Sequence, residues 1–139
     1  MFLLDTNVLS TMMSAAPTKE VVAWVSGQPA EFLFTTTVCQ AEILSGLAIM
    51  PEGRRRLDLE AAARAMFAED FEGRVLPFDM EAAVAYADIF AARRRAGRPA
   101  ATVDLMIAAI ARSQGVTVVT RNVADFEACG VAIVNPWGG

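Results

Sequence analysis

Histidine is absent from the 139-residue sequence, and other reactive side chains are scarce. The chain holds two cysteines, one tyrosine (Tyr86) and a single lysine, Lys19. Without histidine the chain can build neither a Ser-His nor a Cys-His nucleophile, nor a zinc site with a histidine ligand. General-base chemistry is therefore left to carboxylates, to Lys19, to Tyr86 or to a metal-bound water.

Long apolar runs are missing as well. No stretch approaches the roughly 20 residues that a membrane helix requires. Residues 1–5 have neither the basic region nor the apolar length of a signal peptide. We therefore expect a cytoplasmic protein with no membrane segment, in which Cys39 and Cys129 are reduced core thiols and not a disulfide framework.

What the chain does contain is enough apolar material for one domain. With 55% hydrophobic and 20% charged residues, a single domain over residues 1–139 can bury a full core. Short apolar runs alternate with helical patterns, which predicts a parallel sheet covered by helices on both faces. Strands are expected at 1–4, 32–34, 75–78, 116–119 and 131–134, and helices at 19–27, 38–50, 53–70, 80–96 and 102–114.

Four acidic residues lie near the ends of these elements. Asp5 follows the first strand, Glu42 lies early in the helix after the second strand, and Asp125 lies just past the fourth. In a parallel sheet these three emerge at the same edge. Asp104 opens a helix that leads into a strand, so it reaches that edge only if the helix at 80–96 first reverses the chain direction.

Two interpretations of these acids stay open on spacing alone. Four convergent carboxylates repel one another and need a positive counter-charge; oxygen ligands without histidine or cysteine favour Mg²⁺ or Mn²⁺. Such ions support phosphodiester hydrolysis. Alternatively, Asp5 and Asp125 cap local structure, Asp104 interacts with its helix dipole, and Glu42 is a solvated surface residue.

Polar residues beside the acids carry the same two interpretations. Thr6, Asn7, Thr120 and Asn122 flank strand ends, where they would orient a water or a phosphate, or simply make turns. Arg98 and the run 93–95 precede the third acid. They would hold phosphate groups, although a solvated helix end is the slightly favoured interpretation.

The net charge of −4 by itself argues against binding nucleic acid. Without the four acids above, however, the remaining acidic residues equal the 12 basic residues in number. If metal ions neutralise those four carboxylates, the objection weakens.

Four motifs occur in order along the chain. They are Leu3-Leu4-Asp5-Thr6-Asn7-Val8-Leu9-Ser10; Ala41-Glu42-Ile43 with Gly46; Arg98-Pro99 with Asp104 and Ile107-Ala108-Ala109; and Thr120-Arg121-Asn122 with Asp125-Phe126. In this order and spacing the sequence from Met1 to Trp137 resembles the PIN-domain family, in particular the VapC-type toxin ribonucleases of bacterial toxin–antitoxin pairs.

The resemblance implies a three-layer α/β/α fold with a central parallel five-stranded sheet. It also implies that Asp5, Glu42, Asp104 and Asp125 are catalytic acids and metal ligands, with Asp5 and Asp104 the most direct. Mg²⁺ or Mn²⁺ dependence, cleavage of RNA, homodimerisation and a cognate small antitoxin are further expectations. A non-catalytic PIN-fold interaction module and a housekeeping RNA- or DNA-processing nuclease are the alternatives.

Overall fold

A five-stranded parallel sheet forms the centre of the computed structural model, which describes residues 1–138. Its strand order is β3-β2-β1-β4-β5, and every neighbouring pair is parallel. The strands are β1 (Phe2–Leu4), β2 (Leu33–Thr36), β3 (Val75–Leu76), β4 (Thr117–Val119) and β5 (Ile133–Val134). The predicted parallel sheet of five strands is thus confirmed.

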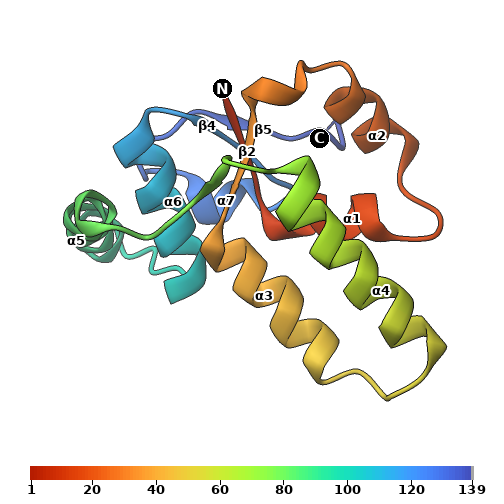
Figure 1. Ribbon diagram of the computed structural model, residues 1–139. Helices are drawn as coiled ribbons and strands as arrows, with labels where there is room; N and C mark the ends of the chain where they lie inside the picture. The colour runs from red at the N-terminus through yellow and green to blue at the C-terminus, as the bar shows by residue number, and fades with distance from the viewer. Residues whose placement is uncertain (139) are drawn as a thin grey trace.

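Helices cover both faces of this sheet. Figure 1 shows α5 and α6 on one side and α1, α2 and α4 on the other, so the predicted three-layer α/β/α architecture is confirmed. No helix within residues 1–138 is long and apolar enough to cross a membrane. The helices are α1 (Thr6–Met13), α2 (Lys19–Ser26), α3 (Thr37–Ala48), α4 (Arg54–Ala65), α5 (Met80–Arg95), α6 (Thr102–Gln114) and α7 (Val123–Phe126), with short turns η1 (Ala30–Phe32) and η2 (Met66–Asp70).

Burial on both faces explains the unalternating apolar strands. Successive residues of β1, Leu3 and Leu4, are both buried, as are Val118 and Val119 of β4. Side chains of successive strand residues point to opposite faces, so a strand with helices above and below it is apolar throughout. Asp5 follows the carboxyl end of β1, and Asp125 lies a few residues beyond the carboxyl end of β4.

Several element boundaries differ from the sequence prediction, and the predicted strands at 75–78 and 131–134 are shortened to Val75–Leu76 and Ile133–Val134. Phe32 belongs to η1, and β2 instead runs on to Thr36, because Thr35 and Thr36 are buried and pair with β3. The single helix predicted over 53–70 is α4 followed by the π-helical turn η2. Helix α1 was not predicted at all: its first residues were interpreted as a turn.

The strand order reverses direction at the centre of the sheet. Starting from β1, the chain first builds outward through β2 and β3, then returns to place β4 on the other side of β1. In open parallel sheets, this switch point leaves a crevice beyond the carboxyl ends of the two central strands. The fold therefore predicts that a ligand site lies between the residues that follow β1 and β4.

Candidate active site

Asp5 lies at this switch point. It follows β1 directly, its backbone N–H donates to Val119 of β4, and it is the N-cap of α1. The carboxylate accepts from the Thr6 N–H at 2.8 Å, from the Thr120 hydroxyl at 2.8 Å and from the Asn7 amide at 3.3 Å. Only 2% of the residue is exposed, so its position is fixed by contacts from both central strands.

Burial affects the ionisation of Asp5. It raises the pKa of this carboxyl, against the lowering effect of the bonds from Thr120 and Thr6. Glu42 and Asp125 raise the pKa further through their negative charges. The capping interpretation of Asp5 is thus confirmed by the geometry, but it coexists with a buried carboxylate under repulsion from other acids.

Glu42 approaches the cleft from α3. The Thr6 hydroxyl at the start of α1 donates to its carboxylate. Helix α3 begins here because Thr36 ends β2 and its side chain caps the helix by accepting from the Cys39 N–H at 2.9 Å. Thr6 therefore connects Asp5, through its N–H, to Glu42, through its hydroxyl.

Asp104 comes from α6, the helix that follows α5. Helix α5 packs against α6, and Asp104 lies half-buried in the first turn of α6. Burial and then the charges of Asp5, Asp125 and Glu42 raise its pKa to about 6. Asp104 is therefore within electrostatic range of the other three predicted acids.

Asp125 lies in α7, a helix of only four residues. Its N–H donates to the Asn122 carbonyl at 3.1 Å, and the Asn122 N–H donates to the Thr120 hydroxyl at 3.0 Å. The same hydroxyl donates to Asp5 and accepts from Asn7. The polar residues that flank the acids thus make turn contacts, as one interpretation expected, and those contacts also hold the acids.

The arginines near the third acid differ in exposure: Arg94, Arg95 and Arg98 are exposed, as the solvated-helix-end interpretation expects, whereas Arg93 is buried. Arg93 is 3% exposed and donates to two backbone carbonyls, so neither the phosphate-binding nor the solvated interpretation fits it. Arg98, expected among the substrate-binding residues, forms an ion pair with Glu127 at 2.8 Å while remaining about half exposed.

Three of the four predicted acids, Asp5, Glu42 and Asp104, line an open cleft of about 480 Å³, whereas Asp125 is not among its lining residues. Within residues 1–138 no three acidic or thiol side chains are grouped closely enough to form a ready metal cage. The carboxylates influence one another electrostatically but are not grouped closely, as expected for like charges that repel one another. The cleft is lined by Asp5, Thr6, Asn7, Ser10, Thr11, Glu42, Asp104 and Asn122.

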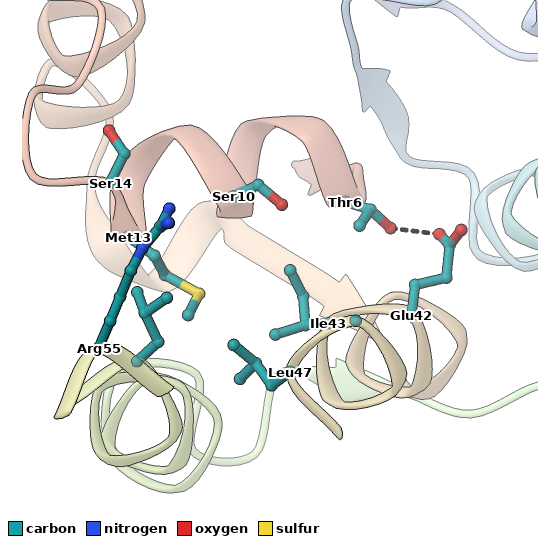
Figure 2. A pocket seen from close by; sticks show the side chains of 10 residues that line it. Thr6, Ser10, Met13, Ser14, Glu42, Ile43, Leu47 and Arg55 are labelled. Atoms are coloured by element: carbon teal, nitrogen blue, oxygen red, sulfur yellow. Dashed lines mark hydrogen bonds between the residues drawn. The ribbon is translucent and has the colours of Figure 1, made fainter. Parts of the chain in front are cut away.

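A second groove of about 250 Å³ continues from the same place. It shares Thr6, Ser10 and Glu42 with the cleft and runs between α1, α3 and α4 towards Arg55. Figure 2 shows Met13, Leu47 and Ile43 along it, with Arg55 at the end opposite Glu42. Because residues 6–13 were not predicted to be a helix, the sequence did not locate this groove or indicate the contribution of Ser10.

Comparison with known proteins relates the chain to PIN domains, both by sequence and by structure. The PIN domain family model matches residues 2–129. VapC ribonuclease Y4jK of Sinorhizobium fredii is 40% identical over 99% of this chain and 98% of its own length. Toxin FitB of Neisseria gonorrhoeae is 36% identical over 99% of both chains. A solved structure of FitAB bound to an IR36 DNA fragment superposes with a TM-score of 0.93 at 36% identity, covering 99% of this chain and 96% of that one.

Proposed function

The chain belongs to the PIN-domain family, and from that premise we propose that it is a Mg²⁺- or Mn²⁺-dependent endoribonuclease, the toxin of a toxin–antitoxin pair. Relatives that align over nearly the whole chain are a VapC ribonuclease and a toxin. The four motifs that carry the resemblance keep all four acids. A non-catalytic interaction module would be expected to have lost at least one of them.

One observation carries the metal dependence. Burial and the charges of other carboxylates raise the pKa values of Asp5 and Asp104. Buried carboxylates under mutual repulsion at neutral pH need a positive partner. The site therefore has the negative charge that a bound cation would balance, and a divalent ion would relieve the repulsion between its carboxylates.

The chemistry of the donor set selects the kind of ion. All four side chains offer carboxylate oxygens, which hard cations such as Mg²⁺ and Mn²⁺ prefer. Asp5 and Asp104 would be the most direct ligands, and Glu42 and Asp125 would complete the site. Such an ion, when bound, supplies an activated water and stabilises charge on phosphate oxygens.

The protein's own contribution is to hold the acids still. Thr120 and the Thr6 N–H fix the two oxygens of Asp5, and the Thr6 hydroxyl fixes Glu42. Asn7 and Asn122 border the open cleft, where their amide groups would contact a phosphate of the substrate. A pre-organised acidic site reduces the reorganisation that the reaction requires.

The partner of the toxin would use the groove that leads into the cleft. Its floor is apolar, through Met13, Leu47 and Ile43, and its far end carries Arg55 (Figure 2). We expect a small antitoxin to lay a helix along this groove and to insert an arginine beside Glu42, where a guanidinium pairs with carboxylates. It would then compete with the metal ion.

A cleavage assay tests the enzymatic part of this proposal. Purified protein is incubated with transfer, ribosomal and messenger RNA and with single-stranded DNA, in Mn²⁺, Mg²⁺ or excess chelator. Cleavage of RNA with either metal and none with chelator is expected, and Asp5→Asn should abolish it while the protein stays folded. Full activity in chelator, or near wild-type activity of Asp5→Asn, would contradict the mechanism, and cleavage of DNA alone would favour the alternative nuclease.

The biological role has its own test. Expression of the chain alone should slow growth, and co-expression with the neighbouring small gene should restore it. The matched control is the Asp5→Asn chain, which should be harmless in both settings. If the wild-type chain is harmless alone and no adjacent gene product binds it, the toxin role fails.

A further inference from the structure

Arg93, near the end of α5, is a buried cation with no acidic partner among residues 1–138. It is 3% exposed, and its guanidinium Nη1 donates to the Ala124 carbonyl at 3.1 Å and to the Glu127 carbonyl at 2.6 Å. Its Nε atom is buried without a hydrogen-bond partner in the same part of the chain. Burial of a guanidinium without an acidic partner is costly. We therefore expect Arg93 to have a specific role at this position.

The two carbonyls that Arg93 contacts bracket Asp125. They belong to α7 and to the residue that ends it, on a segment 31 and 34 residues further along the chain. The last carbonyls of a helix have no partner within the helix. Arg93 satisfies two of them from another element, and so connects α5 to the turn that presents Asp125.

This turn is not held by its own conformational preferences. Helix α7 has four residues, well short of what is stable alone. The residue after Glu127 is Ala128, whose φ of 59° lies in the left-handed region, where residues other than glycine are disfavoured. An outside contact must therefore fix the segment. The half-exposed pair between Arg98 and Glu127 contributes little by comparison.

Arg93 is not among the residues that line the cleft. The thiol of Cys129 is influenced by the charges of Arg93 and Arg112 and by those of Asp104 and Asp125. Cys129 is itself buried, and its Sγ lies 3.8 Å from the Asp125 carbonyl oxygen. The charges of Arg93 and of the two acids thus all act on one buried thiol.

We infer that Arg93 is a positioning residue for Asp125: it clamps the α7 turn so that this carboxylate stays within the acidic cluster. The inference rests on the proposed function, because it gives Asp125 a role in holding the metal ion. Arg93 itself would touch neither metal nor RNA. Residues that orient metal ligands typically change metal affinity or activity about 10-fold or more when they are replaced.

The test compares Arg93→Lys, which keeps the charge but not the geometry that bridges two carbonyls, with Arg95→Lys. Arg95 is an exposed arginine two residues along the same helix. Two quantities are measured besides cleavage: amide hydrogen exchange across residues 123–128, and Mn²⁺ affinity by electron paramagnetic resonance. We expect Arg93→Lys to speed exchange and to weaken Mn²⁺ binding about 10-fold, and Arg95→Lys to match wild type in both.

A double-mutant comparison separates positioning from general stability. If Arg93 acts through Asp125, Arg93→Lys should weaken Mn²⁺ binding in the wild-type background but not further in Asp125→Asn. A lower melting temperature with unchanged exchange and Mn²⁺ affinity would assign Arg93 a purely structural role and overturn the inference. If Arg93→Lys does not fold, Arg93→Gln, which removes the unpaired buried charge, takes its place.

The outcomes also distinguish this inference from the proposed function. If wild-type protein binds no Mn²⁺, the metal-dependent mechanism fails, while the exchange measurement still decides whether Arg93 holds the turn. If wild type binds Mn²⁺ and the Arg93 variants match it in both affinity and exchange, the proposed function stands and the positioning role is wrong.

Discussion

Replacement of Asp104 by asparagine should stabilise the metal-free protein at neutral pH. The pKa of Asp104 is raised from 3.8 to about 6, first by burial and then by Asp5, Asp125 and Glu42. A folded-state pKa above the unfolded value means that the protonated form stabilises the fold. That contribution is complete below about pH 4 and is lost as the pH rises through about 6.

The size of the effect follows from the shift. A rise of about two units corresponds to about 3 kcal/mol at pH 7.5. Because Asp104 is only half-buried, screening by water reduces this to about 1.5 kcal/mol. For a domain of this size, that raises the melting temperature by about 5 °C. At pH 4 the variant and wild type should melt at nearly the same temperature.

Scanning calorimetry of chelator-treated protein at pH 7.5 and pH 4 makes the comparison. Asp88→Asn is the matched control, because it removes the same charge from an exposed position on α5 and should leave the melting temperature within about 1 °C. With saturating Mn²⁺ the order should reverse, since wild type gains stability from the bound ion. An unchanged or lower melting temperature of Asp104→Asn at pH 7.5, or an equal rise at both pH values, would refute the reasoning.

Three further predictions concern Thr120, the two buried thiols and the oligomeric state. Thr120→Val removes the 2.8 Å hydrogen bond to Asp5, so the pKa of Asp5 should rise. The acid limb of the pH profile of cleavage should then move to higher pH, with a rate loss of about 10-fold. Thr120→Ser should behave as wild type, and identical pH profiles of Thr120→Val and wild type would contradict the role of Thr120 in holding Asp5. Burial raises the pKa of the Cys39 thiol to about 11, and Cys129 is also buried, so Ellman's reagent should modify neither until denaturant is added; rapid native labelling would show the burial to be wrong. Light scattering at micromolar concentration should report about twice the 14.9 kDa chain mass, and a strict monomer would count against the expected homodimer.

The sequence by itself determined most of the architecture, because the relevant signals are local. Apolar runs buried on both faces and helical periodicity between them predict a parallel α/β sheet. Acids that directly follow strands are carried to one edge by that topology, which is why Asp5, Glu42 and Asp125 were identified together. Asp104 needed one further assumption, that helix α5 reverses the chain before α6; Asp104 does line the same cleft as Asp5 and Glu42.

The local signals failed where a residue has two roles. Asp5, Thr6 and Asn7 are good turn residues, and they also start α1, with Asp5 as its N-cap. The sequence pattern could not distinguish a turn from a helix start, because both use a side-chain oxygen that accepts a nearby N–H. The groove along α1 was missed for the same reason.

Only the tertiary structure decided what the arginines do. Arg93 and Arg95 are indistinguishable as members of a basic run at a helix end, yet one is buried and the other exposed. The difference arises from α7, whose carbonyls accept from Arg93 across 31 and 34 residues of sequence. Periodicity within α5 contains no information about that segment, since a contact of this kind exists only once the sheet has brought β4 beside β1 and α7 has followed it.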